Sequence, residues 1–81
     1  TFFTFYLSNY PADINIDIYT VSGKKIITLE KYCENYYNVI PWNGKSKNGK
    51  ELSNGPYIYV FNSISGDGET YQEINKLAKL K

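Results

Sequence analysis

Residues 41–59 read PWNGKSKNGKELSNGPYIY and hold the strongest structural signal in the chain. Asparagine precedes glycine three times in this stretch, at Gly44, Gly49 and Gly55. Glycine supplies the positive φ angles that tight turns need, so we expect the chain to reverse direction at these steps. The only tryptophan, Trp42, stands just before the first turn and is predicted to plug the core. All of these residue types are typical of a scaffold, and none resembles an active site.

Outside this stretch, apolar and polar residues alternate with the period of two that marks a strand with one buried face. The clearest case is the row Ile14, Ile16 and Ile18. Similar patterns predict further strands near residues 3–8, 25–29, 37–42, 50–52, 56–64 and 71–81. Short strands separated by turn residues favour an antiparallel β-sandwich. We therefore predict a single all-β domain over residues 1–81, with about seven strands.

Two places in this pattern are irregular. Ile26 and Ile27 are adjacent and would face opposite ways in a strand, so we expect a β-bulge there. Residues 71–81 also fit helical spacing, because Ile74 and Leu77 could share one helix face. The surrounding strands favour a final strand instead.

The composition fits a small globular domain and argues against nucleic-acid binding. Apolar residues make up 42% of the 81 residues, and nine lysines stand against eight acidic residues, for a net charge of +1. The chain has no arginine, whose guanidinium group makes bidentate contacts to phosphate and guanine. No apolar run approaches the roughly 18 to 20 residues that a membrane-spanning helix needs. We therefore expect no nucleic-acid partner and no membrane span; the protein partners that we expect (a neighbouring domain, secretion machinery or copies of the chain itself) follow from the resemblance and the candidate interface described below.

The chain has few residues of the types that bind metals or act as catalytic nucleophiles. The chain has no histidine and one cysteine, Cys33, so the residues for a structural zinc site, a Ser-His-Asp triad or a Cys-His dyad are missing. We expect Cys33 to be a free or half-buried thiol on a loop at residues 30–35; pairing between chains is the alternative. The turns at residues 43–51 carry three lysines and one carboxylate, Glu51, which does not suit calcium. We predict no cofactor, no metal and no enzymatic activity.

The motifs also follow one another in a recognisable order. Ile18-Tyr19 is followed by Gly23, then by Trp42-Asn43-Gly44, and then by Gly55-Pro56-Tyr57-Ile58-Tyr59. In this order and spacing they resemble the immunoglobulin-like domain of the flagellar hook-capping protein, a module common at the C-terminus of secreted bacterial proteins, including those with type IX secretion sorting domains. The resemblance covers essentially the whole chain. It implies a seven-stranded sandwich without catalytic residues, used for scaffolding, sorting or attachment.

The run at residues 56–64 is predicted to be a central strand. In the arrangement that the resemblance implies, the core is filled by Tyr57, Tyr59 and Phe61, while Ile58 and Val60 point outward. Together with Phe2 or Tyr19 they would form an apolar patch of the kind that often marks a docking surface, unless a loop covers it. The candidate interface is therefore Ile58, Val60, Phe2 and Tyr19, and the candidate structural residues are Trp42, Gly44, Gly49, Gly55, Tyr57 and Tyr59.

The predicted function is that of a non-catalytic extracellular module, secreted or at the cell surface, that sorts or anchors an exported bacterial protein. The alternative is a structural subunit that self-associates into a surface fibre or a hook-like assembly. A more distant alternative is carbohydrate binding, since tyrosine rings can stack on sugars; the tyrosines considered are Tyr6, Tyr19, Tyr32, Tyr36 and Tyr37. Because Thr1 runs straight into a strand pattern, we expect a processed protein or a piece of a longer one.

Overall fold

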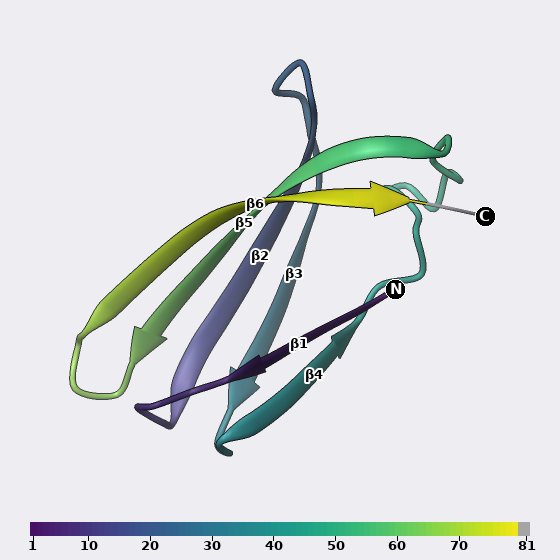
Figure 1. Ribbon diagram of the computed structural model, residues 1–81. Coiled ribbons are helices and arrows are strands. Elements are labelled where there is room, and N and C mark those ends of the chain that lie inside the picture. Colours follow the sequence, from purple (N-terminus) through teal and green to yellow (C-terminus); the bar gives the residue numbers. More distant parts are fainter. Residues whose placement is uncertain (80–81) are drawn as a thin grey trace.

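The computed structural model describes residues 1–79, which contain six β-strands and no helix. The strands are β1 (Phe2–Tyr6), β2 (Ala12–Thr20), β3 (Lys25–Cys33), β4 (Tyr37–Pro41), β5 (Gly55–Ser65) and β6 (Thr70–Lys79). An antiparallel four-stranded sheet has the order β3-β2-β5-β6, and β1 pairs with β4 in a second antiparallel sheet (Figure 1). The predicted all-β architecture is confirmed, with six strands in the described chain instead of about seven.

The isoleucines of β2 form the centre of the core between the two sheets. Ile14, Ile16 and Ile18 are fully buried, whereas the residues between them lie on the opposite face. Successive side chains of a strand alternate between faces, so the period-two pattern places all three on one side. Phe3 of β1 and Ile40 of β4 are buried in the same cluster. The predicted isoleucine row is therefore confirmed as the interior of the molecule.

β3 is longer than the sequence suggested. Residues 30–33, expected to form a loop, continue the strand, and Cys33 pairs with Ala12 of β2. Polar residues are accommodated here because β3 is an edge strand: the Lys31 ammonium group reaches past the sheet and donates a hydrogen bond to the carbonyl oxygen of Val39 (3.0 Å). The prediction of a loop was therefore wrong.

Cys33 is a core residue rather than a loop cysteine. Its side chain is free and almost fully buried at the end of β3. Burial raises the pKa of the thiol, and the nearby charge of Lys31 offsets this only in part. Cys33 therefore behaves as a small apolar side chain of the interior.

The β-bulge expected in this strand is present. Ile18 of β2 pairs with Ile27, but the next residue, Tyr19, pairs with Lys25. Ile26 is thus the extra residue that the pairing skips. It still packs against the core cluster, so the bulge lets both adjacent isoleucines contribute to the interior.

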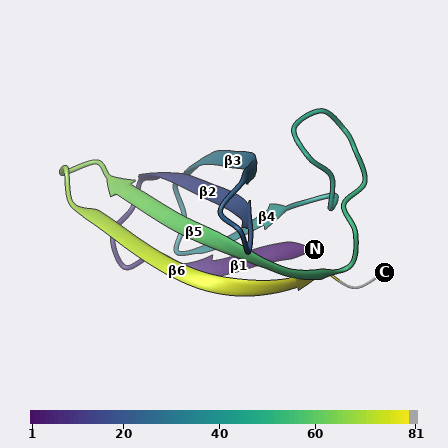
Figure 2. The same ribbon diagram turned by 90° about the horizontal axis from the view of Figure 1, so that it is seen from above.

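The long connection between β4 and β5 contains the three glycines singled out above. Gly44, Gly49 and Gly55 all have positive φ, at 78°, 80° and 142°. The short strand expected at residues 50–52 is reduced to one isolated bridge between Lys45 and Glu51. Next to this bridge, Ser46 donates its backbone N–H to the Lys50 carbonyl oxygen (2.9 Å), and Lys47 donates its backbone N–H to the Ile26 carbonyl oxygen of β3 (3.2 Å). Figure 2 shows the connection projecting from one end of the molecule.

Side chains from the sheets hold this connection in place. Each donates a hydrogen bond to a carbonyl oxygen of the loop: Trp42 to Lys45 (3.0 Å), Tyr57 to Ser53 (2.6 Å) and Lys79 to Leu52 (2.8 Å). Lys79 is nearly buried and also forms an ion pair with Glu51 at 3.2 Å. A Cβ atom at Gly44 would lie 2.8 Å from the Lys79 Cε atom, so this glycine also leaves space for the lysine.

The sandwich is closed on one side and open on the other. The backbones of β3 and β4 approach within 8 Å of each other, whereas no Cα atom of β1 lies within 8 Å of β5 or β6. β1 and β6 are edge strands of different sheets, and neither has a partner on its outer edge within residues 1–79. The open side therefore leaves a groove between them.

Candidate functional site

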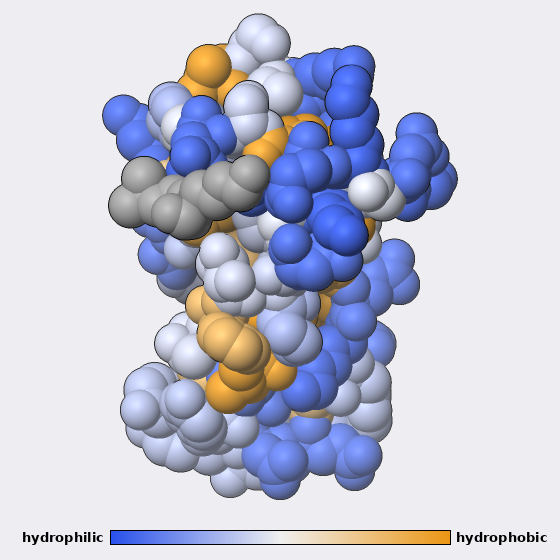
Figure 3. Space-filling view, turned by 90° about the vertical axis from the view of Figure 1, so that its right-hand side faces the viewer, coloured by the Kyte–Doolittle hydropathy of each residue, from blue (hydrophilic) through white to orange (hydrophobic). Residues whose placement is uncertain are grey.

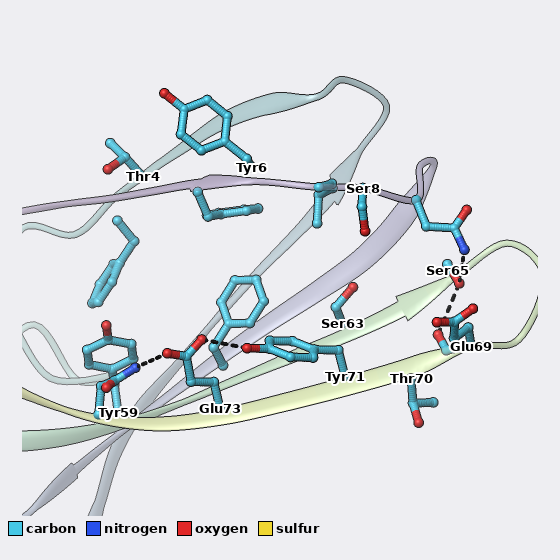
Figure 4. Close-up of a pocket in the computed structure, with 16 residues that line it drawn as sticks. Thr4, Tyr6, Ser8, Tyr59, Ser63, Ser65, Glu69, Thr70, Tyr71 and Glu73 are labelled. Atoms are coloured by element: carbon cyan, nitrogen blue, oxygen red, sulfur yellow. Dashed lines mark hydrogen bonds between the residues drawn. The ribbon is translucent and has the colours of Figure 1, made fainter.

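The groove between β1 and β6 has a volume of about 470 Å³ (Figure 4). β5 provides its floor, and β1 and β6 provide its walls. Its rings come from alternate positions of the three strands: Phe3 and Phe5 of β1, Tyr59 and Phe61 of β5, and Tyr71 of β6. The period-two alternation of each strand thus brings together five aromatic residues that are far apart in the sequence.

These rings bridge the two sheets where the backbones do not meet. Phe3 packs edge-to-face on Tyr59 with ring centroids 5.0 Å apart, and Phe5 packs on Phe61 in the same way at 4.9 Å. Tyr71 lies further along, 6.4 Å from Phe61. Edge-to-face geometry is favourable because the positive edge of one ring meets the negative face of the other. The floor of the groove is therefore an ordered aromatic surface.

The wall formed by β6 carries a hydrogen-bonded carboxylate. The Tyr71 hydroxyl donates to Glu73 Oε2 (2.9 Å), and Asn75 Nδ2 donates to Glu73 Oε1 (2.8 Å) (Figure 4). The hydrogen bonds from Asn75 and Tyr71 lower the pKa of Glu73, and the hydrogen bond to this carboxylate raises the pKa of Tyr71. Glu73 is therefore ionised at neutral pH, with both carboxylate oxygens oriented.

The charged side chains that line the groove are negative. Glu69 and Glu73 are the charged residues that line it, and no lysine of residues 1–79 does so. An aromatic floor beside a fixed carboxylate suits a group that combines an apolar stem with a positive charge, because rings and carboxylates both attract cations. The lining of the groove is therefore chemically complementary to such a group.

The turn between β5 and β6 closes one end of the groove. Asp67 accepts hydrogen bonds from the Ser65 hydroxyl, from Asn9 Nδ2 (3.0 Å) and from the backbone N–H of Glu69 (3.1 Å). These hydrogen bonds, the one from Ser65 above all, lower the pKa of Asp67 to about 2. Through Asn9, this cluster ties the turn that follows β1 to the far end of the other sheet.

Asp67 should make stability depend on pH in acid. Its pKa falls from an ordinary value of 3.8 to about 2 on folding, so the stability it contributes is present above about pH 4 and is lost as the pH falls through about 2. We expect the urea midpoint of the natural protein to fall more steeply over this window than that of Asp67→Asn, with Trp42 fluorescence as the readout. Glu30→Gln, at an exposed position of β3, is the control. A constant difference in midpoint between Asp67→Asn and the natural protein across the window would contradict the role of this carboxylate.

Three of the four candidate interface residues lie together on the outer face of the four-stranded sheet. Tyr19 of β2 is directly opposite Ile58 of β5, and Val60 is opposite Ile74 of β6, which is 64% exposed. Ile58, Val60 and Tyr19 are half-buried. Phe2 is 70% exposed but belongs to β1, in the other sheet. Of the two neighbours expected for Ile58 and Val60, Tyr19 is therefore confirmed and Phe2 is wrong; Ile74 is a further neighbour that was not expected.

The candidate structural aromatics lie inside the sandwich. Trp42 is 3% exposed and Tyr57 is 6% exposed. Tyr59 is partly buried against the core and forms part of the groove floor. β5, which carries both tyrosines, therefore contributes Tyr57 to the core and Tyr59 to the groove.

Three of the five tyrosines considered for sugar binding come together on the surface. Tyr6 of β1 lies beside Tyr36 and Tyr37, with ring centroids at 5.0 Å and 5.2 Å. Tyr19 and Tyr32 lie on the other sheet. The clustered rings are tilted by 40° and 48° to the Tyr6 ring, so they do not form the flat platform on which a sugar face stacks best.

The polar wall of the groove was not among the sites predicted from the sequence. Its signal was available in the strand at residues 71–79, where Tyr71, Glu73 and Asn75 share one face with Leu77 while Ile74 faces the other way. A strand whose inner face carries a glutamate does not complete a closed apolar core. Such a pattern indicates that this part of the interface between the sheets is open.

Comparison of the chain with protein-family models, curated proteins and solved structures found no match. Within residues 1–79, no three His, Cys, Asp or Glu side chains gather in a way that could hold a metal ion. The same part of the chain has no helix with the length and apolarity needed to cross a membrane. The groove and the outer faces of the two sheets are therefore the features from which a function can be inferred.

Proposed function

We propose that this chain is a non-catalytic immunoglobulin-like module that sorts or anchors an exported bacterial protein by docking onto a protein partner. The extracellular setting and the immunoglobulin-like topology rest on the resemblance carried by the motifs around Trp42 and Tyr57. Two antiparallel sheets around one core are compatible with that topology. The docking function rests on the outer surface of the sandwich.

The outer face of the β1–β4 sheet carries this proposal. We call it the tyrosine face; its outward side chains are Phe2, Thr4, Tyr6, Tyr37, Val39 and Pro41. None of them is charged, and Phe2, Tyr6 and Tyr37 are each at least 50% exposed. Buried interface cores are enriched in aromatic residues and depleted of charged ones. Figure 3 shows that hydrophobic side chains reach the surface at several places on one side of the molecule, between hydrophilic ones.

Charging the tyrosine face should abolish docking without unfolding the domain. We expect a Phe2→Lys, Tyr37→Lys variant of the parent protein, made in the cells that naturally produce it, to lose most of its export or surface attachment. Two ammonium groups in a desolvated interface are costly to bury, whereas in the free domain both positions face water. The measurement is the share of parent protein in the extracellular and surface fractions, with circular dichroism of the purified domain as the test of folding.

The matched control is Asn62→Lys, Gln72→Lys, which adds the same charge on the outer face of the other sheet, where the two amides bond to each other. We expect this control to be exported normally. A third variant, Ile58→Lys, Val60→Lys, tests the apolar patch beside Tyr19. Normal export of both the tyrosine-face and the Ile58, Val60 variants, with the fold intact, would exclude docking through either face.

Self-association is the second candidate function, and the edge of β1 favours it. Residues 1–7 read TFFTFYL, without a charge, a proline or a glycine, and such edges pair readily with other strands. A fibre subunit should sediment as growing oligomers as its concentration rises from micromolar to millimolar. Monomers at every concentration, together with no filaments in electron micrographs, would exclude this alternative.

A further inference from the structure

Within residues 1–79, no strand pairs with the edge of β1 that faces the groove. Leu7 donates its N–H to the Tyr36 carbonyl and the Thr1 carbonyl accepts from Trp42, so the odd-numbered residues of this segment bond to β4. Hydrogen-bonding directions alternate along a strand, which turns the N–H and C=O groups of Thr4 and Tyr6 toward the groove. Both residues line the groove although their side chains point to the opposite face. Thr4 and Tyr6 therefore face the groove with their backbone atoms.

This edge has none of the features that normally keep an edge strand from pairing. Proteins block their edges with charged side chains, proline or bulges, and β1 has no such residue and pairs regularly with β4 over all five positions. A peptide added along β1 would span about 16 Å, at roughly 3.3 Å per residue. Its alternate side chains would then point toward the rings of Phe5, Phe61 and Tyr71, which line the groove.

We propose that the groove binds an extended peptide segment of a protein partner, which adds as a strand to the free edge of β1 and places a lysine or arginine side chain against Glu73. This proposal deepens the protein-binding function proposed above. The apolar stem of such a side chain would lie along the rings of Phe61 and Tyr71, and its charged end would meet the carboxylate that Tyr71 and Asn75 hold.

Charge complementarity selects this occupant over a second copy of the chain. The groove carries Glu69 and Glu73 without a lysine to balance them. A β1 strand from another copy brings only uncharged side chains over its five residues, which would cover the Glu73 carboxylate without bringing a cation to it. A segment with apolar residues at alternate positions would pack on the rings, and one basic residue among these inward positions would form an ion pair with the carboxylate.

The test uses two synthetic peptides and the whole chain. Both peptides are blocked at their ends and alternate threonine with valine; the central valine is replaced by lysine in one and by norleucine in the other. Norleucine keeps the apolar stem and lacks the ammonium group. We expect the lysine peptide to bind at least tenfold more tightly in nuclear magnetic resonance titrations, with shifts at the Thr4 and Tyr6 amides. Equal affinity of the two peptides, or no saturable shift, would overturn the proposal.

Two variants of the chain separate charge from strand addition. Glu73→Gln keeps hydrogen-bonding capacity but removes the charge, so it should reduce the affinity for the lysine peptide to that for the norleucine peptide. Thr4→Pro removes an N–H that β4 does not use and should abolish binding of both peptides, whereas Thr4→Val should bind like the natural protein. Undiminished binding by a folded Thr4→Pro variant would overturn strand addition.

Sedimentation of the chain without peptide tests whether the β1 edge binds a second copy of the chain instead of a peptide. Oligomers that disappear in Thr4→Pro but persist in Thr4→Val would assign the β1 edge to a second copy and overturn the proposed peptide site. Glu73→Gln leaves Phe2 and Tyr37 untouched, so normal export of this variant combined with lost peptide discrimination would separate the groove from the tyrosine face. Failure of peptide binding therefore does not remove the docking function, and failure of the tyrosine face does not remove the groove.

Discussion

Replacing Ile16 with aspartate should leave the protein unfolded at neutral pH. Ile16 is fully buried at the centre of the isoleucine row. The change removes the packing of a core side chain, which costs about 2–5 kcal/mol, and buries a carboxylate without a partner, which costs about 5 kcal/mol or more. The sum of about 7–10 kcal/mol exceeds the stability of a small domain at the lower end of the usual range of about 5–15 kcal/mol. We expect far-ultraviolet circular dichroism and urea titration to show loss of the sheet signal in most molecules.

The control places the same carboxylate one residue earlier. Asn15 lies next to Ile16 but on the outer face, so Asn15→Asp should change the free energy of unfolding by only about 0.5 kcal/mol. Similar losses at both positions would contradict the assignment of the two faces of β2. Because one residue separates the two variants, the comparison tests the register of the strand as well as its burial.

Replacing Trp42 with alanine should have the second largest effect. The indole is 3% exposed, and its N–H donates to the Lys45 carbonyl at 3.0 Å. The loss of a large buried aromatic side chain costs about 3–5 kcal/mol. We expect the urea midpoint, followed by circular dichroism, to fall sharply, and the β4–β5 connection to become susceptible to proteolysis before the sheets do.

Trp42→Phe separates packing from the hydrogen bond. Phenylalanine keeps an aromatic ring in the core and loses the N–H donor, so it should cost clearly less than alanine. Equal midpoints for the two variants would show that the ring does not carry the packing of this region. A midpoint for Trp42→Phe equal to that of the natural protein would show that the bond to Lys45 contributes little.

The interior could be predicted from the sequence because it depends on local alternation. Ile14, Ile16 and Ile18 occupy alternate positions and therefore lie on one face of the strand, so an antiparallel sheet that buries this face buries all three. The same holds for the glycines of the β4–β5 connection, whose preceding asparagines indicate positive φ without knowledge of the fold. The bulge at Ile26 was predictable for a similar reason: two adjacent apolar residues cannot both face inward in a regular strand.

The site could not be predicted because it depends on which strands become neighbours. The groove exists because β1 and β6, at opposite ends of the sequence, are edge strands of different sheets on the same side. Phe2 was misplaced for the same reason, since nothing in its local sequence says that β1 pairs with β4. The polar residues 30–33 are typical of a loop, but an edge strand such as β3 also accommodates polar residues. Polarity alone therefore does not distinguish the two.

The unequal lengths of the two outer ladders determine how the molecule would respond to tension. β6 is paired with β5 over ten positions, whereas β1 is paired with β4 over five. If the module is stretched between its two ends, as the proposed anchoring function would require, both ladders are loaded in series, and the shorter one yields at the lower force. β1 would peel away first and leave the four-stranded sheet in register, so that pulling would uncover the aromatic floor of the groove before the chain lost its remaining structure.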